Sequence, residues 1–267
     1  MKDVGLVTIH GMGKVDYNYY SKLEKILKKE LGNQWSRVSF QNIQYAPLLQ
    51  KPQDALWTEM INNQNNLLDF VKIRQFFLFG FSDAATLEYS AHSDKLKYLE
   101  VQKEIQNKLD SVLTDFEGDI SKPVVIIAHS LGCQVISNYI WDAKNNKNIF
   151  ENPDTTDQNK IKFRKLTSLE NLVTTGCNIP LFISGLDKRE CFSKPNDNFV
   201  WDNYYDPDDV LGWPLRQLDD SYNIVNDHHI NAGGIFTSWN PASHNEYWSD
   251  SDVTTPLADI LKSKLNP

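Results

Sequence analysis

Short apolar runs bounded by turn residues recur along the chain. Residues 4–10 (VGLVTIH) and 124–128 (VVIIA) form two such runs, and each leads into a segment that contains glycine. Runs of this length that are rich in β-branched residues are typical of buried strands. An alternation of polar and apolar positions predicts another strand at residues 37–45 (RVSFQNIQY), and shorter segments predict strands at residues 169–175, 199–205 and 234–239.

Segments with helical character alternate with these strands. In residues 17–31, leucine and isoleucine recur at helical spacing, and a glycine ends the pattern. Strands that alternate with helices favour an α/β fold, with a mostly parallel central sheet and helices on both faces, in a single domain over residues 1–267. Further helices are expected at residues 94–113, 134–141 and 253–265, and a polar surface loop at residues 144–160.

An aromatic-rich insertion is expected at about residues 46–90. Its residues 53–89 are expected to be mostly helical and to gather many aromatic side chains, among them Phe76, Phe77 and Phe79. Two interpretations are open. The insertion could form a lid or the wall of an acyl-chain pocket, where these three side chains would contact an apolar substrate. It could equally be a helix buried against the sheet, which is the commoner fate of aromatic runs.

The chain has 267 residues and a formal net charge of −8 at pH 7. It therefore lacks the basic footprint that a nucleic-acid backbone requires, and nucleic acid is not expected as a partner. Its three cysteines, an odd number without metal-ligand or CxxC spacing, favour buried thiols in a reducing compartment. We see no signal-peptide pattern and no apolar run near the roughly 20 residues of a membrane span, so we expect a cytoplasmic protein without a transmembrane segment.

The strand at residues 124–128 ends in an unusual turn, with Ser130 between a histidine and a leucine. The positions two before and two after this serine, Ala128 and Gly132, are small, and a helix is expected to follow. A strained strand–turn–helix that exposes a serine needs small residues at both positions because the backbones crowd there. In this geometry the N–H of Leu131 would lie at the start of a helix, where it could stabilise negative charge. The alternative is that Ser130 is an ordinary helix N-cap.

This turn resembles the nucleophile elbow of the α/β-hydrolase superfamily, particularly its lipases and esterases. The resemblance implies an oxyanion loop of HG type after an earlier strand, and residues 8–14 (TIHGMGK) fit it. It also implies that the backbone N–H of Met12 is the second oxyanion donor beside Leu131, and places His10 near the substrate. A plain tight turn with a capping histidine is the alternative, while a phosphate-binding loop is excluded because no GK[ST] completes that motif.

The family order of nucleophile, acid and histidine directs the search for a base to the C-terminal part of the chain. Of six histidines, His244 lies in a loop directly after the expected strand at residues 234–239, where the resemblance places the base. His228 and His229 precede that strand, and a structural role is expected for both. His92 precedes the elbow, which is the wrong order for a base.

The triad acid is expected after the strand at residues 199–205, in the sequence DPDDVLGWPL. Asp209, followed by two aliphatic residues, best resembles the acid of many lipases, and Asp208 is the second choice. Asp206 precedes a proline and could simply start a turn. A carboxylate here would accept a hydrogen bond from the base, fix its tautomer and stabilise its charged form. The other interpretation is a solvated acidic turn.

The order Ser130, Asp209, His244 implies a serine hydrolase that cleaves a carboxylic ester, of a small molecule or a lipid, through an acyl-enzyme. No metal site is expected because no histidines and carboxylates share ligand spacing, and no cofactor is expected. Two alternatives remain: amide or thioester cleavage on the same fold, and a non-catalytic binding protein of this family.

Overall fold

The computed structural model describes residues 1–12, 16–62, 71–92, 95–231 and 246–266, and within them no side chain of residues 62, 72, 76 or 88–92. The strand expected at residues 234–239 therefore lies outside the described residues. In the part that is described, no helix is long and apolar enough to cross a membrane.

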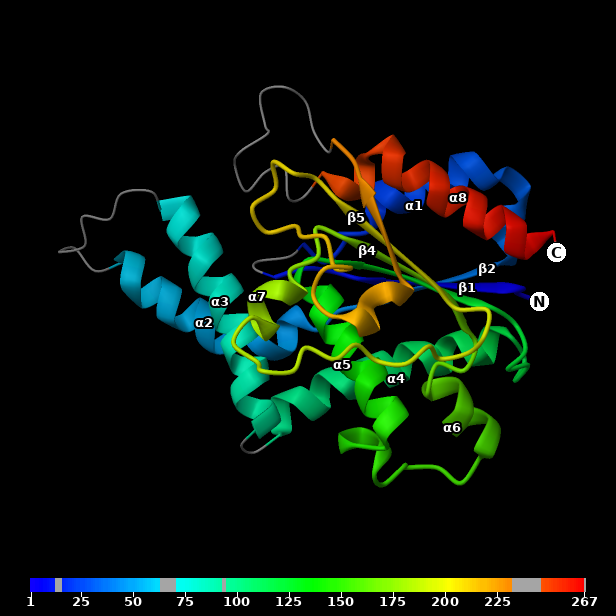
Figure 1. Ribbon diagram of the computed structural model, residues 1–267, viewed down its shortest axis with the longest axis horizontal. Helices are drawn as coiled ribbons and strands as arrows, with labels where there is room; N and C mark the ends of the chain where they lie inside the picture. The colour runs from blue at the N-terminus through cyan, green and yellow to red at the C-terminus, as the bar shows by residue number, and fades with distance from the viewer. Residues whose placement is uncertain (13–15, 63–70, 93–94, 232–245, 267) are drawn as a thin grey trace.

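A six-stranded sheet in the order β2-β1-β3-β4-β5-β6 forms the centre of the molecule (Figure 1), and all five of its strand pairs are parallel. Its strands are β1 (Val4–Ile9), β2 (Val38–Ile43), β3 (Val124–His129), β4 (Leu169–Thr175), β5 (Val200–Tyr205) and β6 (Val225–His229). The expected α/β class with a parallel sheet is confirmed. Five strands lie where the sequence predicts them; β6 was not predicted because its sequence, VNDHH, is mostly polar.

Helices cover both faces of the sheet (Figure 1), and each face has its own apolar core. Along β3 the side chains alternate: Val124 and Ile126 join the core beneath α4 and α5, whereas Val125 and Ile127 join the core beneath α1 and α8. This alternation explains why the strand is apolar at every position. The helices are α1 (Ser21–Leu31) and α8 (Ser251–Leu265) on one face, and α4 (Leu96–Asp115), α5 (Leu131–Asn145) and α6 (Gln158–Arg164) on the other.

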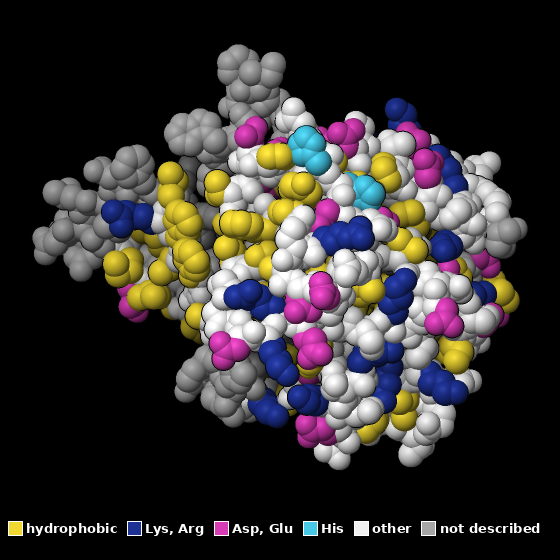
Figure 2. Space-filling view, in the orientation of Figure 1, with side chains coloured by type: hydrophobic (Ala, Val, Ile, Leu, Met, Phe, Trp, Pro, Cys, Tyr) yellow, Lys and Arg dark blue, Asp and Glu magenta, His cyan; other side chains and the backbone are white. Residues whose placement is uncertain are grey.

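The insertion contains two helices, α2 (Ala46–Asn62) and α3 (Val71–His92), which extend to one side of the sheet (Figure 1). The helical character predicted for this insertion is confirmed. Figure 2 shows apolar side chains gathered on its surface, and the large ones that are exposed are Leu56, Met60, Ile61, Val71, Ile73, Phe77 and Phe81. Only part of the aromatic run is thus buried against the rest of the protein.

Three helices depart from the sequence predictions. The helix after Ser130 begins at Leu131 rather than near residue 134, so the turn at Ser130 leads into it without a spacer. The prediction of a surface loop over residues 144–160 missed the start of α6, which Asp157 caps by accepting hydrogen bonds from the N–H groups of Asn159 and Lys160. A short helix, α7 (Ile179–Ile183), follows β4 and was also not predicted.

Candidate active site

The candidate residues that directly follow described strands lie at the carboxyl edge of the sheet, because all of these strands run in the same direction. The loop with His10 and Met12 follows β1, Ser130 follows β3, and Asp209 follows β5. Asn178 follows β4, the strand between those that carry the serine and the aspartate. Open parallel sheets bind ligands beyond the carboxyl ends of their strands, so this edge is where a site is expected.

Ser130 has a backbone conformation that residues other than glycine rarely adopt, with φ of 52° and ψ of −124°. An ordinary N-cap serine has an extended backbone, and its hydroxyl accepts a hydrogen bond from the helix. Ser130 has neither feature, since its side chain makes no capping hydrogen bond. Its own N–H donates to the carbonyl oxygen of Thr175 on β4 at 3.0 Å, which helps to hold the strained turn. Such a conformation costs about 1–3 kcal/mol and persists only where the surroundings enforce it.

Two glycines allow the loop after β1 to press against this turn. A Cβ atom on Gly132 would lie 2.4 Å from the carbonyl oxygen of His10 and 3.0 Å from that of Ile9. A Cβ atom on Gly11 would lie 2.8 Å from the Cβ atom of Ser130. Neither position has room for a Cβ atom. The carbonyl oxygens of the loop after β1 are therefore the reason why the position two residues after Ser130 must be glycine.

His10 is engaged in holding its own loop. Its Nδ1 atom lies 2.8 Å from the carbonyl oxygen of Gly11, and its Nε2 atom accepts a hydrogen bond from the N–H of Ala46 at 3.3 Å. Because Nε2 is an acceptor, Nδ1 carries the proton and donates it. The ring is 3% exposed and stacks on Tyr45, and burial lowers the pKa of His10 from 6.5 to about 4. The imidazole is therefore neutral at pH 7, and both nitrogens are used within the protein.

These contacts fix the direction of the peptide group between Gly11 and Met12. The hydroxyl of Tyr45 also donates to the Gly11 carbonyl, at 3.0 Å, and to the carbonyl of His10 at the same distance. In a trans peptide the carbonyl and the N–H point in opposite directions, so the N–H of Met12 is directed away from Tyr45. On the other side, the side chain of Met12 packs against Gly80 of α3, where an added Cβ would lie 2.4 Å from its sulfur.

The structure separates the three candidate acids. Asp209 is 5% exposed; its Oδ1 atom accepts the N–H of Leu211 at 3.0 Å and its Oδ2 atom accepts the hydroxyl of Tyr247 at 2.9 Å. Asp208 is exposed to solvent. Asp206 is buried, but its side chain accepts the N–H of Asp208 at 2.8 Å, as expected for a residue that starts a turn. Asp209 is thus a buried carboxylate that is held by the buried side chain of Tyr247.

Tyr247 links Asp209 to the turn that contains Ser130. Its hydroxyl accepts the N–H of Asp206 and donates to Asp209, and its ring lies 5.7 Å from that of His129, the residue before Ser130. Burial, followed by the negative charge of Asp209, raises the pKa of Tyr247 well above its usual value, so the hydroxyl keeps its proton. A Cβ on Gly212 would lie 2.7 Å from Oδ2 of Asp209, so the loop closes tightly around this carboxylate.

The expected base, His244, lies outside the described residues, and so does the side chain of His92. His228 and His229 lie within β6. The Nε2 atom of His228 is 2.8 Å from Asp202, and its ring stacks on Tyr204. His129 directs its Nδ1 atom to the carbonyl oxygen of Thr175 at 3.0 Å.

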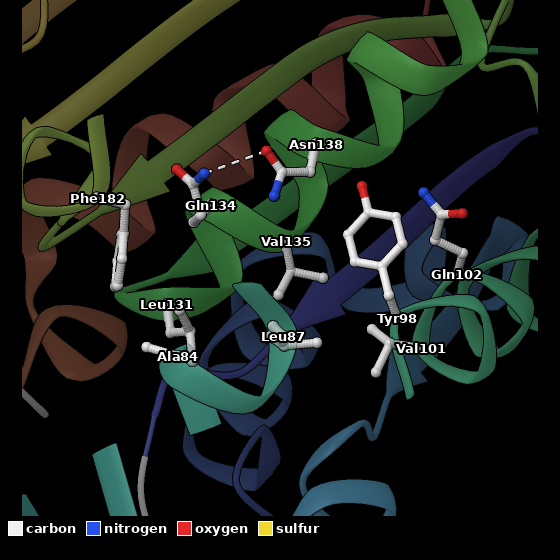
Figure 3. Close-up of a pocket in the computed structure, with 10 residues that line it drawn as sticks. All are labelled: Ala84, Leu87, Tyr98, Val101, Gln102, Leu131, Gln134, Val135, Asn138 and Phe182. Atoms are coloured by element: carbon white, nitrogen blue, oxygen red, sulfur yellow. Dashed lines mark hydrogen bonds between the residues drawn. The ribbon is translucent and has the colours of Figure 1, made fainter. Parts of the chain in front are cut away.

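A pocket lies directly beside the turn (Figure 3). It contains about 360 Å³ of empty space, including space open to solvent, and Leu131, the residue after Ser130, forms part of its wall. In Figure 3, Phe182, Leu131 and Ala84 lie at one end together with Gln134, and Tyr98, Val101 and Gln102 lie at the other. The pocket is lined by Ala84 and Leu87 of α3, Tyr98, Val101 and Gln102 of α4, Leu131, Gln134, Val135 and Asn138 of α5, and Phe182 of α7.

The aromatic residues expected to contact a substrate are placed differently from this lining. Phe79 is fully buried, with its ring 6.4 Å from that of Trp57, and Phe77 is 44% exposed and stacks on Phe81. The side chain of Phe76 is outside the described part of the structure. The same helix, α3, does line the pocket, but with Ala84 and Leu87, which lie more than one helical turn after Phe79.

Two polar residues of this region were missed by sequence reasoning. Asn178 is completely buried, and its Nδ2 atom donates to the hydroxyl oxygen of Ser130 at 3.4 Å. Tyr247 holds Asp209, as described above. The sequence carries a signal for the first of them, since Asn178 comes shortly after a buried strand, as Ser130 does. Nothing in the local pattern around Tyr247 points to a contact with a residue 38 positions away.

Among the residues that the structure describes, no group of three or more histidine, cysteine, aspartate or glutamate side chains could hold a metal ion. No family model matches the chain, and no curated protein matches it. Among solved structures, the chain is similar to acetylxylan esterase and to an iodinated complex of acetyl xylan esterase, with all of each chain covered. The sequence identity is 11% in both comparisons, and the TM-scores are 0.46 and 0.43. At these values, the activity must be inferred from the residues of the site.

Proposed function

We propose that the chain is a serine esterase in which Ser130 is the nucleophile, His244 the general base and Asp209 the triad acid. The observation that carries this proposal is the backbone of Ser130, which has a positive φ and no capping hydrogen bond. A serine that merely began a helix would have no reason to bear this strain. A nucleophile held at a sharp strand-to-helix turn requires it.

The reaction follows from these roles. His244 removes the proton of Ser130 as the hydroxyl oxygen bonds to the carbonyl carbon of the ester. The N–H groups of Leu131 and Met12 donate hydrogen bonds to the oxyanion that forms. The intermediate collapses to an acyl-enzyme, and His244 returns the proton to the departing alcohol. Water, activated by the same histidine, then releases the acid and restores Ser130.

Asp209 supports this cycle as an ionised carboxylate. Hydrogen bonds from Leu211 and Tyr247 stabilise its charged form, which is the form that can accept the N–H of an imidazole and stabilise an imidazolium. Asp208 is exposed, so a charge there would be screened by solvent. Asp209 is therefore the acid of the proposal.

The pocket beside Leu131 supports an apolar acyl group in the substrate. Leu131 contributes its N–H to the oxyanion and its side chain to the pocket wall, so an acyl chain extending from the carbonyl carbon would enter there. Val135 lies one helical turn further along α5 and Leu87 faces it from α3 in Figure 3, and both offer apolar contact. This pocket replaces the phenylalanines as the proposed acyl-binding wall.

Reaction with a fluorophosphonate tests the proposal. Ser130 is only 1% exposed, so a small probe with a short alkyl chain should be used, and the adduct located by mass spectrometry. We expect labelling at Ser130, none in Ser130→Ala, and unchanged labelling in Ser263→Ala, which alters an exposed serine of α8. The assignment would be refuted, and a binding protein favoured, if the folded wild type is not labelled or if the Ser130→Ala variant hydrolyses esters as well as the wild type does.

A further inference from the structure

Asn178 lies beside the nucleophile. It follows β4 through Gly176, whose φ of 51° turns the chain, and it occupies the N-cap position of α7. Its side chain is fully buried, with Nδ2 at 3.4 Å from the Ser130 hydroxyl oxygen. Any group bonded to that oxygen during the reaction is therefore close to this carboxamide.

The local structure does not account for this side chain. An asparagine at an N-cap ordinarily accepts a hydrogen bond from the second or third N–H of its helix. Asn178 makes no capping hydrogen bond, and Pro180, the second residue of α7, has no N–H to offer. The carboxamide is directed to Ser130 instead.

The oxygen atom of the carboxamide, Oδ1, has no hydrogen-bond donor among the described residues, although this atom is buried. It is one of six such buried side-chain atoms in the part of the chain that the structure describes, and it belongs to the side chain that donates to the Ser130 hydroxyl. Leaving a buried acceptor without a partner is costly. The orientation of the amide follows from the mechanism: the Ser130 hydroxyl donates its proton to the base, so its oxygen accepts from Nδ2 and Oδ1 remains open.

We propose that Asn178 is a specificity-determining residue, and that its Oδ1 atom accepts a hydrogen bond from a hydroxyl group on the substrate close to the scissile ester. This inference rests on the proposed function and adds a substrate class to it: esters that carry a neighbouring hydroxyl, either on the alcohol, as in a polyol ester, or on the acyl group, as in a 2-hydroxy acid. An ester without that hydroxyl would leave Oδ1 unpaired in the complex. A site built around a polar group discriminates strongly against the analogue that lacks the matching group.

Matched substrate pairs test the inference. The value of kcat/KM is measured for glyceryl monobutyrate against propyl butyrate, and for ethyl 2-hydroxybutyrate against ethyl butyrate. One hydrogen bond corresponds to a preference of about tenfold, so we expect the hydroxylated member of one pair to be favoured by at least that factor. The pair that shows the preference identifies whether the hydroxyl is on the alcohol or on the acyl group.

Two variants assign the preference to Asn178. Asn178→Leu, similar in volume but without polar atoms, should remove the preference, whereas Asn178→Asp, which retains an acceptor oxygen, should keep it even if turnover is slower. Fluorophosphonate labelling of Ser130 in each variant reports whether the site is intact. If the wild type is labelled but prefers neither hydroxylated ester, or if labelled Asn178→Leu keeps the preference, this inference is refuted and the proposed function stands. If the wild type is not labelled, the proposed function itself fails.

Discussion

Replacing Gly132 by alanine adds one methyl group at the closest approach between α5 and β1. The new Cβ would lie 2.4 Å from the carbonyl oxygen of His10 and 2.9 Å from Cγ2 of Ile9. Since an ordinary contact begins at 3.4 Å, the helix start and the loop after β1 must separate by about 1 Å. Ser130 and Leu131 lie on the α5 side of this contact and Met12 lies on the β1 side, so the position of Met12 relative to the other two changes.

The substitution should affect both stability and turnover, and the size of each effect can be estimated from the close contact. Overpacking of this kind costs about 1–3 kcal/mol, whereas alanine gains up to about 1 kcal/mol over glycine in a helix. The net loss of about 1–2 kcal/mol should lower Tm by about 2–8 °C in a domain of this size. A misplacement of about 1 Å can reduce turnover about 100-fold. The effect on catalysis should therefore exceed the effect on stability.

Thermal unfolding and hydrolysis of a short-chain ester are measured for Gly132→Ala, with Gly185→Ala as the matched control. A Cβ on Gly185 would meet no atom within 4 Å, and its φ is not positive. The control should lie within about 0.5 kcal/mol of the wild type and retain full turnover. If Gly132→Ala keeps both its Tm and its turnover, the close approach does not constrain the nucleophile and the reasoning about the turn is wrong.

Three further predictions concern the groups around the serine. Asp209→Asn should reduce kcat by about 10⁴-fold and Asp208→Asn by less than about twofold, because Asp209 is buried and can orient the base, whereas Asp208 is exposed. The reverse result would move the acid to Asp208. Tyr247→Phe removes a donor to Asp209 and leaves one oxygen of that carboxylate without this hydrogen bond, so turnover should fall about tenfold; unchanged turnover would exclude a role for the contact. The pKa of His10 is about 4 in the folded state and 6.5 in the unfolded state, so the unfolded state binds more protons between these two pH values. The free energy of unfolding should therefore fall by about 3 kcal/mol as the pH drops from 6.5 to about 4. Urea denaturation of His10→Gln should show a flatter dependence of this free energy on pH, and an equally steep one would show that another group is responsible.

Much of the fold could be predicted because each strand and helix carries its own periodicity. The strand predicted at residues 169–175 has the same bounds as β4, and the apolar run at 124–128 is a strand that is buried on both faces. Strand β6 was not predicted because its sequence, VNDHH, is mostly polar and four of its five residues are not buried, as in a loop. That the insertion acts as a lid, and that the chain is a single domain, stay predictions.

The sequence by itself located the turn at Ser130, because a strand, a small residue, a serine, a glycine and a helix start are all local features. The tertiary structure decided what surrounds it. Burial and the contact with Tyr247 distinguish Asp209 from the exposed Asp208, and the carboxamide of Asn178 reaches Ser130 from the loop after a neighbouring strand, 48 residues away in the chain. Local periodicity cannot encode such contacts, since they arise only when the ends of parallel strands are brought together at one edge of the sheet.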